Sequence, residues 1–366
     1  MSAFSHPLFG IYIHWPYCLS KCPYCDFAST VCQTPDYEAL LKGYQRDILI
    51  FKEKIKETRP ITSLFFGGGT PSLMPISFCD TLIHLIQKNF NLSNDIEISL
   101  EANPDAITKE KMTDFQKCGI NRLSLGIQAL NESDLRFLGR HHTLKRALSC
   151  LDEACCVFDN VNMDLIYARP NQTVSDWEKE LRQALAFQLN HYSLYQLTIE
   201  ENTPFGKQHI ETVDENTAVD LYRLTEEITK TAGVPGYEIS NYARIGFACR
   251  HNLTYWRGAD YLGLGPAAHG RINNWETINP RKPQDWLTTG PVCTLLTPAE
   301  RLQERIIMGL RLKQEGFPCN QLDSAGVQKA CTNGWGVVSN DLFFPTEEGF
   351  LILNQLIILV SPESNT

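Results

Sequence analysis

The first 200 residues alternate between short apolar runs and longer amphipathic runs, and this alternation constrains the fold more than any other feature. Short apolar runs bounded by turn residues predict buried strands, whereas apolar residues at helical spacing predict helices. We expect strands at 10–15, 62–66, 96–100, 121–127, 161–166 and 192–198. We expect helices between them at 36–57, 76–89, 108–117, 143–157 and 173–188. Repeated strand–helix units predict an α/β fold with a parallel sheet and crossover helices.

Six strands are too few for a closed eight-stranded barrel, so we expect a partial (β/α)6 barrel whose open side would admit a large substrate. After residue 200 the pattern changes to a helix at 214–232, a loop-rich aromatic stretch, a helix at 298–313, polar turns and an apolar helix at 350–360. This change predicts three parts. They are the partial barrel at 1–205, a linking region at 206–290 and a smaller C-terminal α+β domain of helices and a hairpin at 291–366.

The charge and the cysteine content limit the function classes. A formal net charge of −9 argues against a broad nucleic-acid-binding surface. No apolar run is long enough to predict a membrane span, and the N-terminus lacks the pattern of a signal peptide. The thirteen cysteines are not spaced as in a small secreted domain, so we expect a reducing cytoplasm and metal or cluster chemistry.

Three cysteines follow the first predicted strand at C-x3-C-x2-C spacing: Cys18, Cys22 and Cys25. Thiolates of this kind hold iron–sulfur clusters, and a [4Fe–4S] cluster normally takes four of them. A loop that offers three would leave one iron open to a small chelating molecule, as a catalytic zinc keeps one position open. The alternatives are ordinary loop cysteines or a structural zinc site, for which Cys32 is the nearest further ligand.

Polar or glycine-rich groups follow several of the other predicted strands. The second strand leads into the run 67–71, Gly-Gly-Gly-Thr-Pro, and Glu101, Gln128 and Asp164 lie at or near the ends of the next three. Ligands of parallel α/β folds bind at the carboxyl ends of strands, so these groups predict a shared site. The glycines would let the backbone approach a ligand, and their amides could bind a carboxylate. The plainer alternatives are a tight turn and solvated strand ends.

The segment 251–256, His-Asn-Leu-Thr-Tyr-Trp, lies in the aromatic stretch, which we interpret as a loop. Imidazole is a common haem-iron ligand, and Tyr and Trp rings can pack against a porphyrin. Composition by itself favours the alternative, a structural loop with buried aromatic side chains.

The cysteine motif is followed in order by Gly-Gly-Gly-Thr-Pro, Leu-Glu-Ala-Asn-Pro and Ser-Leu-Gly-Ile-Gln, and together these resemble the HemN/HemW branch of the radical S-adenosylmethionine (SAM) proteins over most of the chain. The resemblance implies that Cys18, Cys22 and Cys25 bind a [4Fe–4S] cluster whose open iron is chelated by SAM. It also implies contacts with that SAM from Tyr12, Gly68 and Glu101. It further implies a second SAM site, described for the oxidase of this branch, lined by Tyr24, Gly69, Thr70, Gln128, Arg140 and Asp164.

This branch contains the oxygen-independent coproporphyrinogen III oxidase, which converts two propionates to vinyl groups, and haem chaperones. The oxidase has a further cysteine where this chain has Phe27, and a longer segment before the cluster than the 17 residues that precede Cys18 here. The His-Asn-x-x-Tyr-Trp motif is typical of the chaperones, which makes His251 a candidate haem ligand. The resemblance therefore favours a cytoplasmic haem chaperone, a monomer or dimer that passes haem to acceptors such as respiratory haemoproteins at the membrane periphery. The oxidase, or a radical SAM enzyme with another substrate, is the alternative.

Overall fold

The computed structural model describes residues 7–54 and 59–362, and within them one mixed sheet of eleven strands forms the body of the molecule. Seven neighbouring strands of this sheet are parallel, and six of them are the strands that the sequence predicts. These six are β1 (Phe9–Trp15), β4 (Ile61–Gly68), β5 (Leu92–Ala102), β6 (Arg122–Gln128), β7 (Asn160–Tyr167) and β8 (His191–Gln196). The partial-barrel prediction is thereby confirmed.

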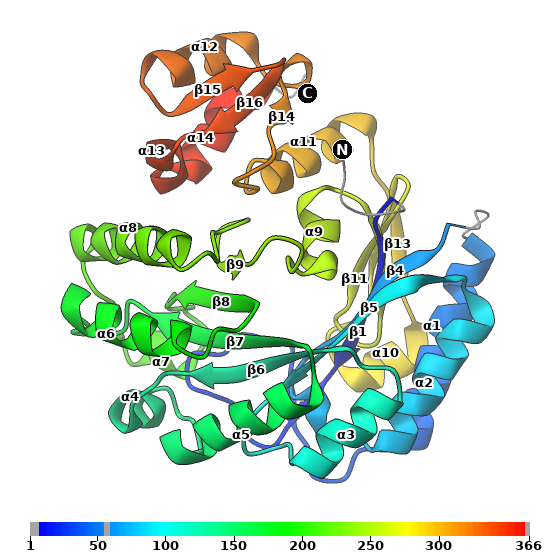
Figure 1. Ribbon diagram of the computed structural model, residues 1–366. Helices are drawn as coiled ribbons and strands as arrows, with labels where there is room; N and C mark the ends of the chain where they lie inside the picture. The colour runs from blue at the N-terminus through cyan, green and yellow to red at the C-terminus, as the bar shows by residue number, and fades with distance from the viewer. Residues whose placement is uncertain (1–6, 55–58, 363–366) are drawn as a thin grey trace.

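Helices cover the outer face of this curved sheet (Figure 1). They are α1 (Tyr37–Lys54), α2 (Ile76–Asn89), α3 (Lys109–Lys117), α4 (Glu132–Phe137), α5 (Leu144–Val157) and α6 (Val174–Leu185). Hydroxyl or amide side chains cap four of them, as at Thr173 before α6, whose oxygen accepts the N–H of Asp176. The sequence analysis did not identify the short helix α4, and residues 55–57 of the helix expected at 36–57 lie outside the described residues.

One apolar core lies between the sheet and these helices, because strand residues such as Ile11, Leu64 and Leu100 point outward against helix residues such as Ile48 and Leu82. All five of these side chains are inaccessible to solvent. The strands are therefore fixed on their helix side by packing, which leaves the inner face of the sheet and the strand ends free to carry polar side chains.

Residues 206–290 continue the main sheet at both of its ends. After α8 (Glu215–Thr231), β9 (Asn241–Ala243) pairs antiparallel with β8, and β10 (Asp260–Leu264) pairs parallel with β1. Three antiparallel strands follow β10: β11 (His269–Ile272), β12 (Trp275–Ile278) and, after α10 (Pro283–Thr289), β13 (Val292–Leu295). The expectation of a loop-rich stretch is wrong here, because strands of three to five residues are too short to show a clear period.

The segment 251–256, expected to be a loop, lies in helix α9 (Arg250–Trp256). A carboxylate at its N-terminus explains the helix: Glu97 of β5 accepts the backbone N–H groups of Arg250 and His251 at 3.0 and 3.4 Å. A carboxylate at this position accepts hydrogen bonds from N–H groups that have no partner within the helix, and its negative charge interacts favourably with the positive end of the helix dipole. Glu97 lies about 150 residues earlier in the chain, so local sequence could not indicate it.

The C-terminal part has its own core, which includes Ile306, Phe317, Phe343 and Leu356. Its elements are α11 (Pro298–Gly309), β14 (Phe317–Pro318), α12 (Ser324–Thr332), β15 (Gly336–Ser339), β16 (Leu342–Pro345), α13 (Glu347–Leu351) and α14 (Leu353–Val360). The strands β15 and β16 form the expected hairpin, and this part lies apart from the main sheet in Figure 1. The three-part division itself stays a prediction.

Two expected C-terminal helices differ in extent from the structure. The helix predicted at 298–313 ends at Gly309, and the one predicted at 350–360 is broken at Ile352, whose backbone leaves the helical region. The remaining short elements are β2 (Tyr17–Cys18), β3 (Thr30–Val31), α7 (Pro204–Lys207) and two 3₁₀ turns at 71–73 and 319–321. No helix in the described part of the chain has the length and apolar character that a bilayer crossing requires.

Candidate functional site

The cysteine motif forms a closed loop at the carboxyl end of β1. The short strands β2 and β3 pair in parallel, with Tyr17 beside Thr30 and Cys18 beside Val31, and so join the two ends of the loop. Inside it, the N–H of Cys25 donates to the carbonyl of Cys22 at 3.1 Å. All thirteen cysteines, each within the described residues, are free thiols.

A cavity of about 370 Å³ lies at this end of the sheet, and a volume of this order suits a small-molecule ligand. Eleven of the thirteen predicted site residues line it: Cys18, Cys22, Tyr24, Cys25, Gly68, Gly69, Thr70, Glu101, Gln128, Arg140 and Asp164. Tyr12 and His251 instead line a second cavity of about 160 Å³ within the barrel. Glu101, Asp164 and Tyr195 line both cavities and so form the wall between them.

The three thiols of the motif line the main cavity and do not converge on the position of a single metal ion. Among the residues that the structure describes, no three His, Cys, Asp or Glu side chains are grouped closely enough to hold a single metal ion. Burial raises the pKa of Cys18 and of Cys25 above the ordinary thiol value, so a bound metal would have to displace their protons. Three thiols around a cavity fit a cluster of several irons, in which each thiolate binds its own iron.

The glycine run at the end of β4 packs directly against the segment that leads into the cysteine loop. The N–H of Gly69 donates to the carbonyl of Trp15, and the N–H of Thr70 donates to that of Tyr17, at 2.7 and 2.8 Å. A Cβ on Gly69 would lie 2.4 Å from the Tyr17 carbonyl oxygen, so only glycine fits. The amides of Gly69 and Thr70 thus bind carbonyl groups of the protein itself. The N–H of Gly68 donates to a carboxylate of the protein, that of Glu101, at 3.3 Å.

Arg140 joins the cysteine loop to the strand ends. Its guanidinium donates to the Cys22 sulfur at 3.4 Å, to the Asn103 side-chain oxygen at 2.5 Å and to the Gly126 carbonyl at 3.1 Å. The preceding Gly139 packs so closely on Pro23 that a Cβ there would lie 2.5 Å from the proline ring. Arg140 therefore links the loop, through Cys22, to the ends of β5 and β6, through Asn103 and Gly126.

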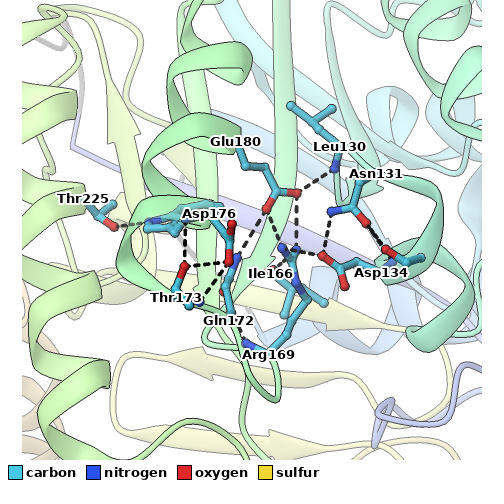
Figure 2. Close-up of polar contacts among 12 residues, drawn as sticks. Leu130, Asn131, Asp134, Ile166, Arg169, Gln172, Thr173, Asp176, Glu180 and Thr225 are labelled. Atoms are coloured by element: carbon cyan, nitrogen blue, oxygen red, sulfur yellow. Dashed lines mark hydrogen bonds and ion pairs between the residues drawn. The ribbon is translucent and has the colours of Figure 1, made fainter.

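A buried ion-pair network supports the segment that carries Arg140 (Figure 2). Arg169, after β7, pairs with Glu180 of α6 and, at 2.9 Å, with Asp134 of α4. The second oxygen of Glu180 accepts the N–H of Leu130 at 2.7 Å. Because Arg169 and Glu180 are shielded from water and hydrogen-bonded to each other, their contacts with Asp134 and Leu130 fix α4 against the barrel and thereby the position of Arg140 after it.

Glu101 and Asp164 are two buried carboxyl groups close to each other. Burial, with the Asp164 charge as the second cause, raises the pKa of Glu101 to about 8. Burial also raises the pKa of Asp164 to about 6, against hydrogen bonds from Ser193, Asn162 and Ser124 that favour its charged form. At neutral pH the wall between the two cavities therefore carries a proton on Glu101 that a cationic ligand would displace.

His251 lies inside the barrel with 1% of its surface exposed. Its ring nitrogens are hydrogen-bonded to Ser63 Oγ at 3.1 Å and to the Tyr255 hydroxyl at 2.7 Å. The ring is stacked on Phe65 and on Tyr12, with centroids 5.0 and 6.1 Å apart. Burial, aided by the charge of Arg122, lowers the pKa of His251 to about 3, so the imidazole is neutral. A haem iron could reach it only if α9 moved.

A chain of contacts runs from this interior to the cysteine loop. Tyr12 stacks on His251, and its hydroxyl is 3.1 Å from His14 Nδ1. The other nitrogen of His14 is 2.9 Å from the carbonyl oxygen of Ala28, within the loop. The two predicted residues outside the main cavity are therefore connected to it through side chains of β1.

The sequence analysis missed several polar residues that line the two cavities: Asn103, Arg122, Asn162, Ser193 and Tyr195. Asn103 lies two residues beyond Glu101 in the same strand-end motif, which was a usable signal. Tyr195 lies near the end of β8, where the same strand-end argument applies. Arg122 and Asn162 occur near the beginnings of their strands and point into the barrel, which only the tertiary structure shows.

The family model described as the radical SAM superfamily matches residues 12–184. A zebrafish (Danio rerio) protein named radical S-adenosyl methionine domain-containing protein 1, mitochondrial, is 40% identical over 72% of this chain and 60% of its own length. A protein of Buchnera aphidicola named heme chaperone HemW is 32% identical over 97% of this chain and 98% of its own length.

The fold is also found in a solved structure. Coproporphyrinogen III oxidase (HemN) from Escherichia coli superimposes with a TM-score of 0.81, at 19% identity, over 97% of this chain and 90% of that one. At this identity the likeness shows the fold, and it includes the C-terminal part as well as the barrel. Because a HemW protein matches along almost the whole chain, at 32% identity over 97% of it, this protein belongs to the HemW family of the radical SAM superfamily.

Proposed function

We propose that this protein is a haem chaperone that binds haem and transfers it to acceptor haemoproteins, with a [4Fe–4S] cluster and SAM as its resident groups. The observation that carries the proposal is the similarity over 97% of this chain and 98% of a protein named heme chaperone HemW. The site geometry supports it, because the cysteine loop and the strand ends meet around one cavity of small-molecule size.

In this proposal Cys18, Cys22 and Cys25 hold the cluster. Glu101 and Tyr12 contact the SAM bound to it, beside the close-packed glycines after β4. A bound cluster would supply the electron that cleaves SAM. Glu101 would lose its proton to solvent when the positively charged SAM binds beside it, because a nearby cation lowers a carboxyl pKa.

A second SAM position, with Tyr24, Gly69, Thr70, Gln128, Arg140 and Asp164 around it, forms part of the proposal on the basis of the cavity that these residues share. Arg140 has a structural task in addition, since its guanidinium already contacts Cys22, Asn103 and Gly126.

The second candidate function is that of the oxidase, with which the fold is compatible. At 19% identity this similarity extends to the fold alone. Phe27, where the resemblance places a cysteine in the oxidase, is 57% exposed at the rim of the main cavity. An apolar, exposed side chain at this position cannot act as a thiol, and so the chaperone is the better-supported function.

Two assays on one reconstituted sample separate these functions. The protein is incubated without oxygen with SAM, a reductant and coproporphyrinogen III, and chromatography measures protoporphyrinogen. A haem titration of the same sample measures binding. Stoichiometric haem with no product supports the chaperone. Product over many turnovers makes the protein an oxidase, and a sample with neither property contradicts both functions.

A further inference from the structure

The cysteine loop exposes three large apolar side chains to solvent. Leu19, Phe27 and Val31 lie within 13 residues of each other, and 54%, 57% and 52% of their surfaces are exposed. The pairing of Cys18 with Val31 brings the two ends of the loop side by side, with Leu19 directly after that pair. Isolated apolar residues on a surface need no explanation, whereas three on one short loop indicate a contact surface.

Two cations lie at this apolar surface. The Lys21 ammonium donates to the carbonyl of Phe27 at 2.8 Å, and the Arg281 guanidinium donates to the carbonyl of Asp26 at 2.9 Å. Both contacts are with backbone oxygens. In the described part of the chain, neither cation has a carboxylate within ion-pairing distance. Both side chains therefore keep donor capacity for an anionic group on a ligand.

We propose that haem binds on the outer surface of the cysteine loop, with its macrocycle on Leu19, Phe27 and Val31 and its propionates at Lys21 and Arg281. This inference rests on the proposed haem-chaperone function and gives that function a location. Haem has an apolar plane with two carboxylates on one edge, and the loop offers the complementary combination. Phe27 also lines the main cavity, so the surface begins at the cavity rim.

The size of the surface favours haem over a protein partner. Three half-exposed side chains offer on the order of 250 Å² of apolar area, comparable with one face of a flat macrocycle. A stable protein interface needs about 800 Å² from each partner. The interior cavity beside His251 is the other location to consider, but its volume of about 160 Å³ is below the range of about 300–1,000 Å³ for pockets of drug-sized ligands.

The test uses the full, cluster-reconstituted protein and a haemin titration followed by absorbance. The double variant Leu19→Ser/Phe27→Ser should bind haemin at least tenfold more weakly, whereas Ile245→Ser, which changes a 96% exposed apolar residue elsewhere, should bind it normally. Lys21→Glu should also weaken binding, and Lys230→Glu, on an exposed part of α8, should not. Haem dimethyl ester, which lacks the propionate charges, should bind the Lys21→Glu variant and the parent equally well.

The outcomes separate this inference from the proposed function. If the parent binds no haemin, the chaperone function fails. If the parent and the double variant bind haemin equally well, the location is wrong. If that variant binds haemin normally but fails to transfer it to an apo-haemoprotein, the surface contacts the acceptor protein instead of haem. Cluster absorbance and SAM binding show that each variant is intact. If the double variant loses its cluster, the test rests on Lys21→Glu. If this substitution weakens the binding of haemin and of haem dimethyl ester equally, the proposed location is wrong.

Discussion

The cysteine loop and helix α9 are the two regions proposed to contact haem, and they differ in how many partners their side chains have within the protein. In α9, His251 has hydrogen bonds at both ring nitrogens and aromatic rings on its faces. On the cysteine loop, Leu19 and Phe27 remain exposed, and among residues 7–54 and 59–362 the partner of Lys21 is a backbone carbonyl. The ligand-type side chain of the α9 motif is thus used in internal packing. The cysteine loop, by contrast, has exposed side chains that can contact a ligand.

The difference is instructive because imidazole and aromatic side chains serve equally well in a haem site and in a barrel interior. Burial distinguishes the two, since a ring held between Phe65 and Tyr12 cannot bind iron without losing these contacts. The motif prediction that His251 binds haem stays open to experiment. The structure gives the same residue a second role as a support for Tyr12.

The largest expected effect concerns the inner side of the cysteine loop. Replacing Cys22 with Ala should abolish the brown absorbance of the anaerobically reconstituted protein, because the cluster would lose one of three thiolates. Cys32→Ala is the matched control, since this thiol does not line the main cavity, and it should keep the absorbance. A cluster that survives in the Cys22 variant, or disappears in the control, would contradict the assignment of the three ligands.

Replacing His251 with Ala should lower the free energy of unfolding by about 3–5 kcal/mol, because a cavity forms and Ser63 and Tyr255 lose buried partners. SAM affinity should fall as well, since Tyr12 loses its stacking partner. Denaturant unfolding and a SAM titration measure these effects, with His84→Ala on the exposed surface of α2 as the control.

The same variant sharpens the comparison of the two regions. If haem binds on the cysteine loop, His251→Ala should retain haemin affinity in samples that are folded and hold their cluster. A folded variant with intact SAM binding and no haemin binding would instead establish α9 as the haem region, as the motif predicts.

Glu101, on the wall between the two cavities, should make stability depend on pH. Its pKa rises from 4.5 to about 8 on folding, so the folded state holds an extra proton between these values. That contribution is fully present below pH 4.5 and is lost as pH rises through 8. Between pH 5 and 8 the apo parent should lose about 3–4 kcal/mol that Glu101→Gln retains, because one pKa unit corresponds to about 1.4 kcal/mol. Unfolding at several pH values tests this, with the exposed Glu227→Gln as control. Parallel pH profiles for Glu101→Gln and the parent would contradict the prediction.

The smallest effect concerns a single hydroxyl group. Tyr255→Phe keeps the ring that packs edge-on against His251 and removes its hydrogen bond, which should cost about 1 kcal/mol of unfolding free energy. Tyr261→Phe is the control, because the neighbouring Tyr261 ring packs on Tyr255 and its hydroxyl has no hydrogen bond among the described residues. Equal stability of the two variants would show that the His251 ring is held by stacking alone.

Local sequence determined the periodic part of this protein. The six predicted strands and their helices carry the pattern in the chain itself, because each buried strand must be apolar and each helix must show one apolar face. The cysteine spacing and the polar groups at the strand ends followed from the same reasoning. Since parallel strands end at one edge, Glu101, Gln128 and Asp164 could be expected around one cavity before any coordinates, and the structure places them there.

Tertiary structure decided whatever depends on partners that are distant in sequence. Glu97 makes a helix of the segment that contains His251, and Arg169 fixes the helix before Arg140 by reaching Glu180 and Asp134. The strand β10 joins β1 only after some 250 residues of intervening chain. Burial is a property of the whole fold, so the sequence could mark His251 as a candidate haem ligand and Phe27 as a difference from the oxidase. Only the tertiary structure could place the first in the interior and the second at the surface.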